Sequence, residues 1–157
     1  MNMRVKHRGA AAVGYLDELD PVASTAVAYL RLWCDGVDAQ MAIDRDFATA
    51  FGVEQGRIVS QSFGQLCKMC VHHARRPLMR HGVNCRCLGA DESCFANFIG
   101  YASEGAREDA LMMAMTIVPP EKAHILAGLA EEFGMALRKM AVHFHPNVTY
   151  HNNQTLH

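Results

Sequence analysis

Residues 120–140, PEKAHILAGLAEEFGMALRKM, carry the clearest periodic pattern in the chain and decide the predicted fold. Apolar side chains recur there at steps of three or four residues, which is the spacing of one buried face of an α-helix. The predicted face consists of Ile125, Leu129, Phe133, Ala136 and Met140, flanked by Leu126 and Leu137. Pro120 suits the first position of a helix, because the N–H that proline lacks would have no partner there. The stretch therefore predicts a helix with one side in a hydrophobic core.

Five further helices are predicted upstream, from residues that start and stop helices. Asp20 and Pro21 form an N-cap followed by proline at the first helical position, and Gly36 ends the helix that follows. Asp38 can cap the next helix, which stops at Gly52. The predicted spans are 21–36, 38–52, 55–75, 91–105 and 107–118.

Two of these helices have apolar patterns that predict how they pack. In the helix over 55–75, the predicted buried face is Val59, Phe63, Leu66, Cys70 and His73. The segment over 107–118 has almost no polar face after Asp109. Because a segment that is apolar all round is typical of the middle of a bundle, we expect this helix to be buried at the centre.

The fold class that follows is all-α, a single-domain bundle of about six helices. The 157 residues suit one domain, and no segment shows the two-residue alternation of β-branched side chains that predicts a strand. We expect an N-terminal arm over residues 1–19, a helical domain over 20–142 and a polar, irregular C-terminal tail over 143–157. A Cys/His/Arg-rich loop over 77–90 is predicted to connect the third and fourth helices.

The composition predicts a cytoplasmic protein. Half of the residues are apolar, a fifth are charged and the net charge is −1, so the whole molecule has no polyelectrolyte character. No run of about 18 apolar residues occurs, so we expect no transmembrane helix and no membrane partner. Because cytoplasmic thiols are reduced, the six cysteines favour burial, metal binding or redox chemistry over a disulfide framework. The sequence also lacks the signature motifs of nucleotide-binding proteins, metalloproteases and α/β-hydrolases.

Residues 67–87, CKMCVHHARRPLMRHGVNCRC, gather four cysteines, three histidines and five Lys or Arg residues without an acid. Zinc takes about four thiolate or imidazole ligands, so this stretch predicts a structural zinc site. The candidate ligands are Cys67, Cys70, Cys85, Cys87, His73, His81 and Cys94. The alternative is a set of buried thiols without metal, because Cys70 and His73 continue the apolar face of their helix and free cysteine packs like a small hydrophobe.

The same stretch is strongly basic. Its candidate anion-binding residues are Arg75, Arg76, Arg80 and Arg86. The planar guanidinium group forms forked hydrogen bonds to phosphate or carboxylate, so the predicted partner is anionic, a protein or a small anion ahead of a nucleic acid. The alternative is a solvated face, or one whose arginines pair within the chain with Asp91, Glu92 and the acidic N-terminal region.

Together these patterns favour binding over catalysis. The leading hypothesis is a small helical binding protein, a regulatory or adaptor module in which zinc or thiol packing orders the basic loop. The first alternative is a thiol-dependent enzyme or redox sensor that uses one cysteine of the Cys85–Cys87 pair, with His81 as base and the arginines holding a negatively charged substrate. The second alternative is a helical carrier of a haem-type cofactor. The methionine-rich stripes of the last two helices are a candidate homodimer interface.

Overall fold

The computed structural model describes the backbone of residues 8–154 and the side chains of residues 9–141. Its elements are η1 (Arg8–Ala10), β1 (Ala12–Tyr15), η2 (Leu16–Glu18), α2 (Pro21–Cys34), α3 (Val37–Phe51), α4 (Val53–His72), β2 (Cys87–Gly89), α5 (Ala90–Ser103), α6 (Arg107–Ile117) and α7 (Pro120–Gln154), where η marks a short 3₁₀ helix. The described part of the chain thus contains six α-helices and one two-stranded sheet. The predicted all-α bundle is confirmed, and within residues 8–154 every helix is too short or too polar for a bilayer span.

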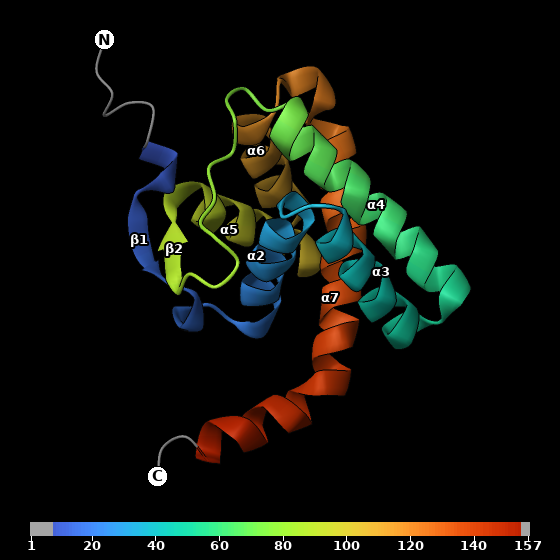
Figure 1. The fold of residues 1–157 in the computed structure, drawn as a ribbon. Helices are drawn as coiled ribbons and strands as arrows, with labels where there is room; N and C mark the ends of the chain where they lie inside the picture. Colours follow the sequence, from blue (N-terminus) through green and yellow to red (C-terminus); the bar gives the residue numbers. More distant parts are fainter. Residues whose placement is uncertain (1–7, 155–157) are drawn as a thin grey trace.

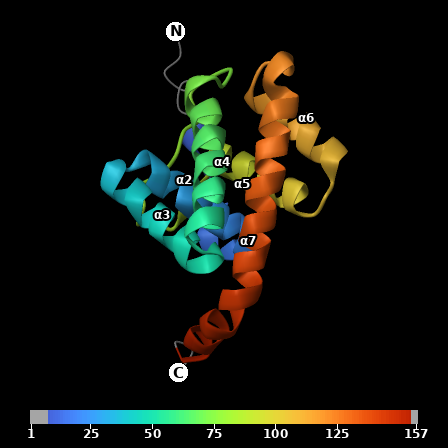
Figure 2. The same ribbon diagram turned by 90° about the vertical axis from the view of Figure 1, so that its right-hand side faces the viewer.

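Helix α7 runs through the bundle and organises it. Helices α4, α5 and α6 all pack against α7, and Figure 2 shows α4 lying beside it. Helix α2 packs against α3 and α5, and the small sheet lies at the edge of the molecule next to α5 (Figure 1). The segment between α4 and β2, residues 73–86, passes α2 before it joins the sheet (Figure 1).

The sheet was not expected from the sequence. Strand β1 pairs with β2 in the antiparallel sense, with Tyr15 opposite Cys87 and an irregularity between Ala12 and Gly14. Strands of four and three residues are too short to carry a period-two pattern, so only tertiary pairing reveals them. Part of the predicted N-terminal arm, residues 8–19, is thereby attached to the bundle, and residues 1–7 lie outside the described residues.

The predicted helix boundaries are best where local chemistry sets them. The Asp20 carboxylate accepts a hydrogen bond from the Ala23 N–H at 2.8 Å, as expected of an N-cap. Gly36 and Gly52 join α2 to α3 and α3 to α4 with φ values of 114° and 86°, a region that favours glycine. The prediction that Asp38 caps the second helix is wrong, because α3 begins at Val37 and Asp38 lies in its first turn.

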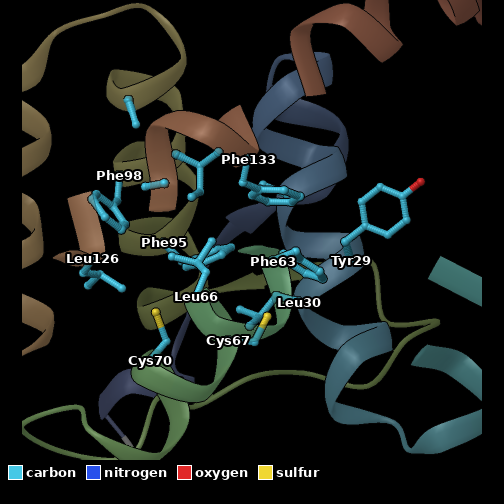
Figure 3. Close-up of a cluster of buried hydrophobic side chains, with 14 of the residues drawn as sticks. Tyr29, Leu30, Phe63, Leu66, Cys67, Cys70, Phe95, Phe98, Leu126 and Phe133 are labelled. Carbon is cyan, nitrogen blue, oxygen red and sulfur yellow. The ribbon is translucent and has the colours of Figure 1, made fainter. Parts of the chain in front are cut away.

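Aromatic side chains from α3, α4 and α7 meet in the core. The rings of Phe63 and Phe133 stack with centroids 4.3 Å apart, and Phe47 packs edge-on against them at 6.2 and 6.4 Å. Figure 3 shows Phe63 and Phe133 in the same cluster as the sulfurs of Cys67 and Cys70. Such aromatic pairs add about 0.5–1.5 kcal/mol beyond the burial of their area, so this cluster ties α7 to α3 and α4.

The buried face of α7 differs from the predicted one. Leu126, Phe133 and Leu137 are buried, whereas Ile125, which the periodicity assigns to the core, is 61% exposed. Two neighbouring rows of this helix are apolar, and the row that faces inward also carries small residues such as Ala130. Small side chains let adjacent helices approach closely, and the period of an apolar pattern does not reveal which row has that advantage.

The prediction that residues 107–118 form the centre of the bundle is wrong. Helix α6 buries Ala110 and Ala114, while Met112 is 63% exposed. It lies at the edge of the bundle against α5 and α7 (Figure 2), because α7 occupies the centre. An apolar composition indicates burial only when no other helix competes for the central position.

The expectation of an irregular tail over 143–157 is also wrong for most of its length. Helix α7 continues to Gln154, and residues 155–157 lie outside the described residues. Adding residues to a helix that is already formed costs far less than nucleating one, so a polar segment can continue a helix that it would not start.

Candidate functional site

A buried arginine, Arg31 of α2, fixes the loop between α4 and β2. Its Nε and Nη2 donate to the Glu92 carboxylate of α5 at 2.5 and 2.9 Å. Its Nη1 donates to the backbone carbonyls of Gly82 and Cys85 at 3.1 and 2.6 Å, and Nη2 donates to the Cys87 carbonyl at 2.7 Å. A guanidinium has five N–H groups, and Arg31 forms five hydrogen bonds, so every donor of this buried side chain is satisfied.

Glu92 neutralises the buried charge of Arg31. The side chain of Arg31 is 1% exposed and that of Glu92 is 0% exposed. Burial raises the pKa of Glu92, but the hydrogen bonds and charge of Arg31, together with the backbone N–H groups of Gly89 and His81, outweigh it and leave that pKa below its ordinary value. The carboxylate is therefore ionised and joins α2, α5 and the loop at one point.

Sequence reasoning misses this pair, although the chain carries one signal for Arg31. Ala23 and Val27 are buried at steps of four along α2, and Arg31 is the next residue in that row. A charged residue on the apolar face of a helix is expected to need a buried partner. Nothing local identifies the partner, because Glu92 lies 61 residues further along the chain.

His81 and Cys85 lie within hydrogen-bond contact on the loop that Arg31 holds. The Cys85 Sγ is 3.6 Å from His81 Nδ1, and His81 Nε2 is 2.8 Å from the carbonyl oxygen of Ala10. A carbonyl oxygen can only accept, so the proton of the neutral imidazole is on Nε2 and Nδ1 is free to accept from the thiol. The ring is therefore oriented as a base toward Cys85, the orientation that activates a cysteine nucleophile.

Cys87 completes a pair of neighbouring thiols. Partial burial raises the pKa of Cys87, and both the negative charge of Cys85 and the hydrogen bond between the two thiols raise it further. The Arg31 guanidinium acts in the opposite direction and lowers the pKa of Cys87. The two sulfurs therefore share one environment, in which a thiolate on Cys85 disfavours a second one on Cys87.

The other predicted zinc ligands lie elsewhere. Cys67 and Cys70 are completely buried in the hydrophobic core (Figure 3), where burial raises the pKa of Cys70 to about 12 and that of Cys67 well above its usual value. Cys94 is exposed on α5. His73 is exposed because it lies just after α4, which ends at His72, and its Nδ1 contacts Lys122.

The seven candidate ligands are thus spread over several environments. Among the side chains of residues 9–141, no group of three or more His, Cys, Asp or Glu residues is arranged to hold a metal ion. Zinc binding therefore stays a prediction without an assembled set of donors. The alternative of buried thiols matches the positions of Cys67 and Cys70.

The four candidate anion-binding arginines divide into two kinds. Arg76 forms a forked pair with Asp91 at 2.9 and 2.5 Å, and Arg75 donates through Nε to the Met115 carbonyl at 3.0 Å. Arg80 and Arg86 are exposed, and neither forms an ion pair with a described side chain. Pairing within the chain, the alternative weighed from the sequence, thus occurs at Arg76.

Native-state alkylation should separate five of the six thiols. We expect iodoacetamide to label Cys85 before Cys87, because the raised pKa of Cys87 keeps it protonated, and to leave Cys67 and Cys70 unmodified. Peptide mass mapping at increasing times measures the order, with the exposed Cys94 as internal reference and denatured protein as control. Labelling of Cys70 as fast as Cys94 would contradict the buried position.

Acid should remove the contribution of the Arg31–Glu92 pair. Because the folded-state pKa of Glu92 lies below its value in the unfolded chain, the stabilisation is complete above the unfolded pKa and is lost as pH falls through the folded one. Urea unfolding at a series of pH values should therefore show wild type losing its advantage over Glu92→Gln below about pH 4.5. A difference between the two proteins that does not change with pH would contradict the ionised pair.

Comparisons of the chain with protein-family models, with curated proteins and with solved structures found no match.

Proposed function

We propose that this protein is a thiol–disulfide redox module in which Cys85 and Cys87 interconvert between a dithiol and an intramolecular disulfide. The observation that carries the proposal is that one buried guanidinium, that of Arg31, donates to the carbonyls of both cysteines while His81 Nδ1 faces the Cys85 sulfur. Backbone and base are thus fixed around the same two thiols. Reactive cysteines are typically found beside a histidine and a cation in such partly exposed surroundings.

Cys85 is the nucleophile in this proposal, and the oxidant is a disulfide, RSSR. His81 Nδ1 takes the proton of Cys85, whose thiolate attacks one sulfur of RSSR; a bond from Cys85 to that sulfur forms, and RS⁻ leaves. The second thiolate, on Cys87, then attacks the Cys85 sulfur and releases the other RS⁻. Each RS⁻ takes up one of the two thiol protons, so one RSSR and one dithiol become two RSH and one protein disulfide.

The charges around Cys87 favour this order of events. The negative charge of Cys85 raises the pKa of Cys87 only while Cys85 is a thiolate. Once Cys85 is in the mixed disulfide, that effect ends, while the Arg31 guanidinium still favours the Cys87 thiolate. The Cys87 thiol therefore stays protonated while Cys85 attacks RSSR, and it ionises more readily once Cys85 is in the mixed disulfide.

Trapping of the mixed disulfide tests these roles. With 2-hydroxyethyl disulfide as oxidant, we expect Cys87→Ser to accumulate a stable adduct on Cys85 and wild type to lose two hydrogens without an adduct. Cys85→Ser is the matched control: it also removes the Cys85 charge, but the contact with His81 Nδ1 belongs to position 85, so peptide mapping should find that an adduct forms on its Cys87 more slowly than on Cys85 of Cys87→Ser. An adduct that forms equally fast in both variants would contradict the assignment of the nucleophile.

The role of His81 has its own signature. His81→Gln should slow adduct formation in the Cys87→Ser background near neutral pH and converge with the parent in alkaline solution, where Cys85 ionises without a base. Equal slowing at every pH would indicate a structural role instead.

A second candidate function, the anion-binding module favoured by the sequence, is supported by the exposure of Arg80 and Arg86. It needs no thiol chemistry, so a chain that binds a small anion but forms no Cys85–Cys87 disulfide would favour it.

A further inference from the structure

A cavity of about 340 Å³ lies against the loop that carries the thiol pair; His81 lines it, whereas Cys85 and Cys87 do not. Its walls come from the end of α2 and from the loop, and the residues that matter for chemistry are Cys34, Asp35, Arg80 and His81. Its volume lies within the range of sites for small molecules. His81 belongs to both places, because the imidazole that contacts Cys85 also lines the cavity.

The charges at this cavity favour an anion over a cation. Arg31 also lines the cavity, but its ion pair with Glu92 weakens its field there relative to that of the exposed Arg80. Burial raises the pKa of the half-buried Cys34, and the exposed Arg80 guanidinium offsets part of that rise; both side chains line the cavity, so the field of Arg80 reaches into it. Asp35 is the one acidic side chain among the residues that line the cavity, against two basic ones, Arg31 and Arg80.

We infer that the oxidant of the Cys85–Cys87 pair is a small disulfide that carries carboxylate groups, bound in this cavity with one carboxylate on Arg80. This inference rests on the proposed function and adds the substrate class and the residue that selects it. Arginine recognises carboxylates through planar, forked hydrogen bonds, which gives Arg80 a geometric as well as an electrostatic preference for such a ligand. A disulfide bound there contacts His81, whose Nδ1 is 3.6 Å from the Cys85 sulfur.

The chemistry is that of the proposed exchange, with R now specified. Cys85 forms a bond to one sulfur of the bound disulfide, the first carboxylate-bearing thiolate leaves, and attack by Cys87 on Cys85 releases the second. Both products are anionic thiols that take up the two protons of the original dithiol.

Oxidation by three disulfides of similar size and different charge tests the inference. The probes are dithiodipropionate, which is anionic, 2-hydroxyethyl disulfide, which is neutral, and cystamine, which is cationic. The loss of two hydrogens from the peptide that holds Cys85 and Cys87 is followed by mass spectrometry at low ionic strength. Each rate is divided by that of the same probe with dithiothreitol, so that the intrinsic reactivity of the probe cancels.

The expected order is anionic, then neutral, then cationic. Arg80→Gln should lower the normalised rate with dithiodipropionate about fivefold and leave that with the neutral probe unchanged. Arg57→Gln is the matched control, because it removes an exposed charge that lines a different cavity on α4. Physiological salt should reduce the preference, since the Debye length is then about 8 Å.

Two other outcomes overturn the inference, and they can be distinguished from failure of the proposed function. Equal normalised rates for the three probes, or equal effects of Arg80→Gln and Arg57→Gln, would remove the substrate class while leaving the redox pair intact. Absence of a Cys85–Cys87 disulfide with every probe would remove the proposed function itself.

Discussion

Replacing Arg31 with methionine is expected to lower the free energy of unfolding by about 3–5 kcal/mol, because the substitution leaves the Glu92 carboxylate buried without its partner. Three backbone carbonyls of the loop, those of Gly82, Cys85 and Cys87, lose their donor at the same time. For a chain of this length the loss corresponds to a fall in Tm of roughly 6–20 °C. Urea unfolding and thermal melting at neutral pH measure it.

Arg107→Met is the matched control for this substitution. Arg107 also pairs with a glutamate, Glu131, but its side chain is 80% exposed and the contact is 3.2 Å long. Exposed pairs contribute at most about 1 kcal/mol, so this variant should unfold close to wild type. Equal, small losses in both variants would contradict the central position of Arg31.

The double variant Arg31→Met/Glu92→Leu separates the two parts of the effect. Removing both charges eliminates the unpaired carboxylate, so the double variant should be more stable than the sum of the single changes indicates. It should still lack the hydrogen bonds to the loop, and the alkylation rates of Cys85 and Cys87 should therefore stay altered. Strict additivity would mean that the two side chains do not act as a pair.

Phe133→Ala should also cost about 3–5 kcal/mol, because it removes the ring that stacks on Phe63 at 4.3 Å and leaves a cavity between α7 and α4. The expected loss is large because Phe133 is completely buried and contacts aromatic rings from two other helices. Urea unfolding measures it, with the slope of the transition as a check that the denatured state is unchanged.

Ile125→Ala is the control on the same helix. Ile125 is 61% exposed, so truncation should change the free energy of unfolding by no more than about 0.5 kcal/mol. The two residues belong to the same predicted face of α7. A loss of several kcal/mol from Ile125→Ala would mean that the periodicity, not the observed packing, identifies the core.

The parts of the fold that sequence predicts are those that local chemistry sets. Asp20, Gly36 and Gly52 mark helix ends through a side-chain hydrogen bond or a left-handed φ value, and each acts within a few residues. Period alone predicts that α7 is a helix, but it does not choose between the neighbouring apolar rows that hold Ile125 and Leu126. That choice depends on what α4, α5 and α6 place opposite each row.

The candidate site divides in the same way. His81, Cys85 and Cys87 are found from sequence because their side chains carry the chemistry and lie within seven residues of one another. Cys67 and Cys70 are grouped with them by composition, yet the core of the bundle separates them. The loop is held in place, as the zinc hypothesis requires, but by Arg31 and Glu92, which meet across 61 residues and have no local signature as a pair.

One measurement tests the redox pair on its fixed loop most directly. Wild-type protein is equilibrated with 2-hydroxyethyl disulfide, the remaining thiols are blocked, and the peptides are analysed by mass spectrometry. We expect one peptide that has lost two hydrogens and holds both Cys85 and Cys87, and a return to the dithiol on reduction. Unlinked Cys85 and Cys87, or a link that joins either of them to another cysteine, would contradict it.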